Sequence, residues 1–225
     1  MFKSVKTGFL ATILVSSAII ANAQKKISQG TVTYGVEYSL PAEQASLASQ
    51  LPKEQKVKFS GNVMRMDMQQ GPASIGILQD FVEKTGLMLI DVPIAQMQYA
   101  VKMTKEDVAK AEEAAPKLSD FKATGEKQKV GDYNAEKYSY KDDKGGTYEL
   151  WATKDVELPN GFAGQQFKDI KGALVKYTTF QNGMKVTLTI KNISEDKVGP
   201  FSLDVPSGYE LKTMQEIMAM QGGGE

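Results

Sequence analysis

Three methionines, Met64, Met66 and Met68, stand at alternate positions of the chain. Alternate side chains of a β-strand point to the same face, so this spacing predicts one methionine-lined surface. Methionine is flexible and polarizable, and such a surface adapts well to apolar ligands of varied shape. Packing in an ordinary protein core explains the same spacing, because methionine also fills irregular gaps there.

Thioether sulfur is also a soft ligand, so the same three residues offer a site for copper(I) or silver. Same-face residues of an extended strand lie about 7 Å apart, and three sulfurs would have to converge on one ion from that spacing. The chain has no cysteine or histidine to complete such a site. We therefore rank a soft-metal site below a cavity for an apolar ligand.

Other apolar side chains are candidates for the wall of the same cavity. Trp151 is the single tryptophan, and it can equally line a cavity, contact a partner or anchor a core. The remaining candidates lie on predicted strands: Met97, Tyr99, Leu87, Leu89 and Leu188.

The absence of histidine and cysteine excludes several catalytic classes. It removes Ser-His-Asp triads, thiol nucleophiles and the usual zinc sites. The adjacent acids Asp142 and Asp143 are explained by a hairpin loop, and a calcium site needs more oxygen ligands than they supply. The sequence does not give the separation of Glu149 and Asp155, on which a glycosidase role would depend. We expect a protein that is not an enzyme and that has no cofactor and no resident metal.

The first 23 residues have the layout of a cleaved secretion signal. Lys3 and Lys6 form a basic start, residues 8–20 form an apolar run, and small residues precede the junction between Ala23 and Gln24. The apolar run is shorter than a transmembrane helix usually needs. We expect the mature protein to begin at Gln24 and to work in the periplasm or outside the cell.

Charge and hydropathy narrow the range of partners. The chain has 27 basic and 27 acidic residues, and two of the basic ones lie in the signal, so the mature chain has a net charge of −2. Nucleic-acid binding is not expected, because it needs a strongly basic face. No later apolar run approaches the length of about 18 residues that a transmembrane helix needs. The sequence gives no oligomeric state.

Most of the mature chain alternates between apolar and polar residues, which is typical of half-buried strands. We predict strands at residues 31–38, 55–59, 63–68, 74–82, 86–92, 97–103, 123–130, 135–140, 147–153, 173–180 and 184–193. Residues 86–92 are apolar on both faces, so this strand is expected to be covered on both sides. Short helices are predicted at residues 41–50, 104–115 and 211–220, followed by a disordered tail at 221–225.

Consecutive strands without intervening helices predict an antiparallel arrangement. The fold class that fits best is mainly β (α+β): one large curved antiparallel sheet, or open half-barrel, with a few short helices on its concave face. A two-sheet sandwich is the alternative. No internal repeat or boundary divides residues 24–220, so we expect a single domain.

Two segments carry a family resemblance. Gly131, Tyr133, Ala135, Lys137 and Tyr138 are followed by a second group, Gly146, Trp151 and Thr153. This pattern resembles an uncharacterised, domain-of-unknown-function family of secreted bacterial proteins, many of them of the Bacteroidetes type. Its layout is similar to that of the periplasmic lipoprotein carriers LolA and LolB, whose open half-barrel holds an apolar cavity. The resemblance implies a LolA-like fold and an apolar cavity, but no activity.

These observations lead to one preferred function and two alternatives. The preferred function is binding or carrying an apolar ligand, such as a lipid or acyl chain, in a cavity lined by Met, Leu, Val and Tyr. The first alternative is a structural or stress-related interaction module of the envelope with no small ligand. The second alternative is the copper(I) binder described above.

Overall fold

The computed structural model describes residues 24–41, 43, 51–181 and 184–222. The predicted signal at 1–23, nearly all of the helix predicted at 41–50 and the Asn182-Gly183 turn lie outside these residues. So do residues 223–225 of the predicted tail.

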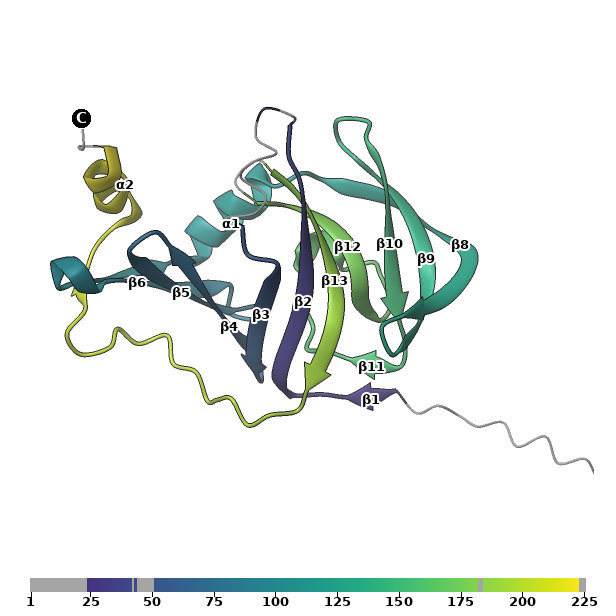
Figure 1. The fold of residues 1–225 in the computed structure, drawn as a ribbon, viewed down its shortest axis with the longest axis horizontal. Coiled ribbons are helices and arrows are strands. Elements are labelled where there is room, and N and C mark those ends of the chain that lie inside the picture. The colour runs from purple at the N-terminus through teal and green to yellow at the C-terminus, as the bar shows by residue number, and fades with distance from the viewer. Residues whose placement is uncertain (1–23, 42, 44–50, 182–183, 223–225) are drawn as a thin grey trace, which may run out of the picture.

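One twelve-stranded sheet dominates the structure (Figure 1). Its strands follow in the order β14 (Glu210–Leu211), β7 (Met97–Met103), β6 (Thr85–Val92), β5 (Ala73–Asp80), β4 (Val63–Gln70), β3 (Glu54–Ser60), β2 (Gln29–Ser39), β13 (Met184–Ser194), β12 (Ala173–Gln181), β10 (Thr147–Thr153), β9 (Tyr133–Asp142) and β8 (Leu118–Val130). All pairs are antiparallel except β14 with β7. Among the described residues the edge strands β14 and β8 do not pair with each other, so the sheet stays open.

The predicted mainly β fold with one large antiparallel sheet is therefore confirmed, and the two-sheet sandwich is not observed. The sheet is mixed, because the short strand β14 runs parallel to β7. A separate parallel pair joins β1 (Lys25–Lys26) to β11 (Val156–Glu157). Sequence alternation did not predict these parallel pairs, because strands of two residues have no readable period.

Alternation explains the main core. In β2, Val32 and Tyr34 are buried while the residues between them are partly exposed. Leu188 and Ile190 of β13 lie directly opposite Val36 and Tyr34 of β2. These side chains share what we call the inner face, the side toward which the sheet curves (Figure 1).

A long connection fills the inner face at the β8 end of the sheet. Residues 158–172, which we call the plug loop, join β11 to β12 and contain the short 3-10 helix η3 (Gln165–Phe167). Phe167 packs edge-to-face against Tyr177 and Tyr140, with ring centroids 5.4 and 6.1 Å apart. At this end of the sheet the plug loop therefore packs against the inner face and completes the core.

The β14 end is covered on both faces, as predicted for residues 86–92. Leu87 and Leu89 face outward and pack against an extended segment, residues 195–209, through Phe201, Leu203, Val205 and Tyr209. Ile90 points to the inner face and packs with Ile217 of helix α2 (Met214–Gly222). The chain after β13 thus runs along the sheet to the edge formed by β14 (Figure 1).

Helix α1 (Lys105–Ala114) also covers the inner face, and Val108 is its one buried side chain. Thr104 caps it in a reciprocal capping box with Asp107. Helix α2 begins at Met214 rather than at Leu211, because Glu210 and Leu211 pair with β7 as strand β14. A second 3-10 helix, η2 (Pro93–Ala95), links β6 to β7. Neither α1 nor α2 has the length and apolar composition that crossing a bilayer requires, and no other described helix does.

Candidate ligand-binding clefts

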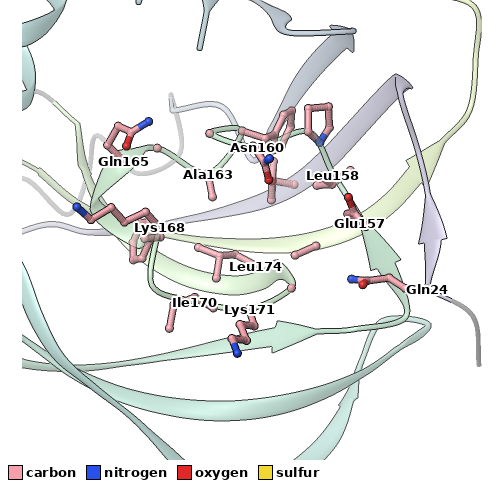
Figure 2. Close-up of a pocket in the computed structure, with 18 residues that line it drawn as sticks. Gln24, Glu157, Leu158, Asn160, Ala163, Gln165, Lys168, Ile170, Lys171 and Leu174 are labelled. Carbon is pink, nitrogen blue, oxygen red and sulfur yellow. The ribbon is translucent and has the colours of Figure 1, made fainter. Parts of the chain in front are cut away.

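The plug loop separates two hollows on the inner face. The first, of about 480 Å³, lies between the plug loop and strand β12 (Figure 2). Its apolar lining includes Tyr34, Leu158, Phe167, Ile170 and Leu174, while Gln24, Lys168 and Lys171 add polar groups. This first cleft is therefore mixed in character.

The second hollow, which we call the methionine cleft, measures about 580 Å³. It lies between the plug loop, helix α1 and the inner face of strands β4, β5 and β7. Its apolar lining includes Met64, Ile77, Phe81, Met103, Val108 and Phe162. Charged groups also border it, among them Lys84 and Glu112, which form an ion pair of 2.9 Å. An apolar wall with charged groups at its border is the usual character of a small-molecule site.

Strand register explains the apolar wall. Met64 lies opposite Phe59 and Gln79, and Met66 lies opposite Val57 and Ile77. Met68 lies opposite Ile75 and is 38% exposed. The three methionines therefore share the inner face, as their spacing predicted, and Met64 lines the cleft itself.

The neighbours of the Met66 sulfur are apolar side chains and one amide. Across the sheet, Met66 has Val57 on one side and Ile77 on the other, and its sulfur accepts a hydrogen bond of 2.7 Å from Gln55. Within the described ranges no group of three or more acidic residues is placed to hold a metal ion.

Met97 and Tyr99 of β7 lie on the inner face beside α2, away from the plug loop. The Tyr99 hydroxyl donates to the Met97 sulfur at 3.0 Å, and Tyr99 packs with the cluster around Ile217. Leu87 and Leu89 lie on the other side of the sheet under residues 195–209. The structure therefore does not bring these two leucines into one cavity with the methionines.

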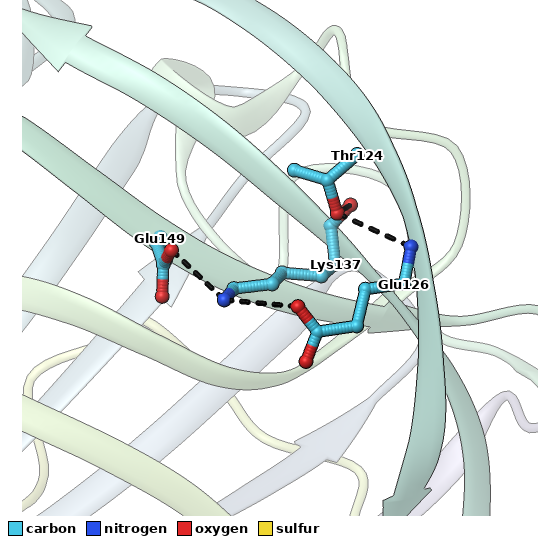
Figure 3. Close-up of polar contacts among 4 residues, drawn as sticks. All are labelled: Thr124, Glu126, Lys137 and Glu149. Carbon is cyan, nitrogen blue, oxygen red and sulfur yellow. Dashed lines mark hydrogen bonds and ion pairs between the residues drawn. The ribbon is translucent and has the colours of Figure 1, made fainter.

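Leu188 and Trp151 occupy the main core, where each is more than 90% buried. Trp151 of β10 lies opposite Lys137 of β9, whose ammonium lies 5.7 Å from the indole centroid. Lys137 is held by ion pairs to Glu126 at 3.2 Å and Glu149 at 2.9 Å (Figure 3). Hydrogen bonds to Glu149 and Glu126 raise the pKa of Lys137, so this lysine stays charged. Trp151 therefore packs as part of the core, which is one of the three roles that the sequence allows for it.

The plug loop was not predicted as part of the site. The signal that could have revealed its role is the pair Phe162 and Phe167 in a glycine-rich connection. Gly161 and Gly164 take φ values of +89° and +90°, which other residues rarely adopt. These glycines let the chain turn tightly enough to place both rings on the inner face.

The buried phenols at the base of the plug loop are neutral. Burial raises the pKa of Tyr177 to about 12 and also raises the pKa of Tyr34, whose ring meets that of Tyr177 at 6.1 Å. The wall shared by the core and the first cleft therefore carries no ionised tyrosine near neutral pH.

A family model described as "Domain of unknown function (DUF4412)" matches residues 44–209. The chain belongs to this family. The predicted membership in a domain-of-unknown-function family is thereby confirmed. The DUF4412 region extends from the segment before β3 to Tyr209. It contains the wall that the two clefts share. A comparison with curated proteins gives no significant match.

The residue pattern that suggested the family lies on one hairpin of the DUF4412 region, strands β9 and β10. Ala135 lies opposite Thr153, and Lys137 lies opposite Trp151. The Thr153 hydroxyl is fully buried; it donates to the Asn134 carbonyl at 2.7 Å and accepts from the Asp155 amide at 3.1 Å. The pattern in this DUF4412 chain therefore has a structural basis, which is hairpin register and packing.

Proposed function

We propose that this protein binds or carries an apolar ligand, a lipid or an acyl chain, in the methionine cleft, and that it is not an enzyme. The observation that carries the proposal is the cleft of about 580 Å³ between α1 and the inner face of the sheet. Its volume falls within the range of about 300–1,000 Å³ that is usual for small-molecule sites. Each methylene of a bound chain that leaves water would contribute about 0.8 kcal/mol.

The weak attachment of helix α1 supports reversible binding. Only Val108 of this helix is buried. The ion pairs of Lys84 with Glu112 and of Lys105 with Glu83 are exposed, and such pairs contribute about 0–1 kcal/mol each. Movement of α1 away from the sheet would therefore cost little and would open the cleft along its length.

The sequence supports the place of action and the absence of catalysis. The layout of residues 1–23 is that of a cleaved signal, so we place the protein in the periplasm or outside the cell. The similarity to LolA and LolB that the sequence suggests supports a carrier role, which we offer by that analogy. The lack of histidine and cysteine leaves few routes to catalysis.

A second candidate is an interaction module of the envelope that has no small ligand. It is favoured by exposed apolar side chains at the β14 end, where Ile94 is 87% and Met218 is 62% exposed. Copper(I) binding by Met64, Met66 and Met68 is a third candidate, which stoichiometric copper(I) binding lost on their replacement by leucine would establish.

The first experiment is native mass spectrometry, with organic extraction, of the protein purified from the envelope of its own host. We expect a lipid at near-stoichiometric occupancy. An empty protein that also fails to bind fluorescent fatty-acid probes would overturn the carrier proposal.

A matched pair of variants locates the site. Ala111 lines the methionine cleft, whereas Ala114 lies exposed on the same helix outside the residues that line it. We expect Ala111→Trp to fill the cleft and abolish probe binding, and Ala114→Trp to leave binding unchanged. Equal binding by both variants would show that the ligand does not occupy this cleft.

A further inference from the structure

Four lysines border a groove of about 440 Å³ at the β8 end of the sheet. Lys127 and Lys129 come from β8, Lys154 follows β10, and Lys171 closes the plug loop just before β12. These positions are up to 44 residues apart in sequence, and the curl of the sheet brings them to one hollow.

None of these four lysines forms an ion pair with another residue that the structure describes. Lysines on the neighbouring strand behave differently: Lys137 pairs with Glu126 and Glu149 (Figure 3), and Lys141 pairs with Asp120. The four groove lysines are exposed and keep their donors available for an incoming group.

Two acidic residues also line the groove, and each already has a partner. The Asp155 carboxylate accepts from the backbone amide of Asn134 at 2.7 Å and from its side-chain amide at 3.1 Å. Glu136 lies against the Tyr138 hydroxyl, whose pKa is raised by burial and then by this carboxylate. Four ammonium groups against two engaged carboxylates leave the groove locally positive, although the whole chain has a net charge of zero.

The floor of the groove keeps the space open. Ala135 and Ala152 line it, and both are buried, so small side chains stand where larger ones would fill the hollow. Lysine binds phosphate as a strongly hydrated point charge, and several lysines around a hollow suit a compact anion. A long basic stripe, which nucleic acids require, is not present in the groove.

We propose that this groove binds a compact phosphate-bearing anion with two or more negative charges, either free or as a lipid headgroup. It has no lining residue in common with the methionine cleft. The inference is therefore independent of the apolar-ligand proposal, and either can fail without the other.

The test is isothermal titration calorimetry of the full mature chain with sodium tripolyphosphate at low ionic strength. A parallel sedimentation assay with cardiolipin-containing vesicles separates a lipid headgroup from a free anion. We expect binding in at least one arm, and the arm that binds identifies the source of the phosphate.

The decisive variant replaces Lys127, Lys129, Lys154 and Lys171 by glutamine. Its matched control replaces four exposed lysines outside the groove, Lys102, Lys110, Lys144 and Lys197, with the same change in net charge. We expect binding at least about tenfold weaker for the groove variant and little changed for the control, because local charge-assisted contacts are lost only in the former.

Circular dichroism checks that both variants fold, and the single changes Lys154→Gln and Lys171→Gln, each expected to weaken binding, replace the fourfold variant if it does not. The proposal fails if the wild-type protein binds neither probe. It also fails if the groove and control variants lose affinity equally, which would indicate non-specific attraction.

Discussion

The rings of Phe162 and Phe59 meet edge-to-face, with centroids 5.2 Å apart and planes at 68°. Phe59 is a fully buried residue of β3, and Phe162 projects from the plug loop. Phe162 lines both the first cleft and the methionine cleft. This contact is therefore the partition between the two hollows and a point at which the plug loop is attached to the sheet.

Removal of the Phe162 ring should join the two hollows. We expect Phe162→Ala to lower the free energy of unfolding by about 2–4 kcal/mol, since the ring is half-buried and its loss leaves a cavity. The variant should also bind longer acyl probes than the wild-type protein does. Urea denaturation and a probe-length series measure the two effects, with Phe162→Leu as the control that keeps most of the partition. Unchanged stability in Phe162→Ala would show that the plug loop does not depend on this contact.

Gly172 ends the plug loop where a side chain is not tolerated. Its φ is +112°, and a Cβ atom there would lie 2.2 Å from the backbone oxygen of Thr153. We expect Gly172→Ala to destabilise the protein by about 3 kcal/mol or more, because it combines backbone strain with a clash against backbone. Gly145→Ala is the control, since its φ of +82° carries strain but no atom lies within 4 Å. Thermal unfolding of both variants tests this, and equal losses would contradict the role of the clash.

The Thr153 hydroxyl should stabilise the β9–β10 hairpin. It is buried between the Asn134 carbonyl and the Asp155 amide. We expect Thr153→Val to cost about 1–3 kcal/mol, because the Asn134 carbonyl and the Asp155 amide lose this partner without a change in side-chain shape. Thr147→Val, at an exposed position of the same strand, should be nearly neutral. Chemical denaturation compares them, and a neutral Thr153→Val would argue against the bridging role.

Stability should fall at high pH through the buried phenols. Burial raises the pKa of Tyr177 from 10.0 to about 12 and raises that of Tyr34 as well. The folded state thus favours the neutral phenol, and the unfolded chain releases this proton first as the pH rises. The contribution of the neutral Tyr177 phenol to the free energy of unfolding is therefore fully present below pH 10. It is lost between about pH 10 and 12 and amounts to about 2–3 kcal/mol.

The comparison of wild type with Tyr177→Phe isolates this effect from other groups that titrate in the same range. Urea denaturation at pH 8, 10 and 11.5 should give a steeper decline for the wild type than for the variant. Parallel declines would mean that Tyr177 does not contribute to the alkaline loss.

The chain itself determined the strands, the antiparallel hairpins and the α1 cap. Period-two alternation in residues such as Val186, Leu188 and Ile190 admits only a half-buried strand, and Thr104 with Asp107 fixes a helix start through local hydrogen bonds. The hairpin of Lys137 and Trp151 likewise carried the family pattern, because its register follows from a short turn.

Only the tertiary structure decided what each face contacts. Alternation predicts that Leu87 and Leu89 share one face of β6 and that Met88 and Ile90 share the other. Because the strand is apolar on both faces, the sequence does not reveal which face contacts α2 and which contacts residues 195–209. The plug loop and the lysine groove depend on contacts between residues far apart in the chain, such as Phe59 with Phe162. Such contacts form only when the curved sheet brings its strands around a common interior, and no local pattern encodes that geometry.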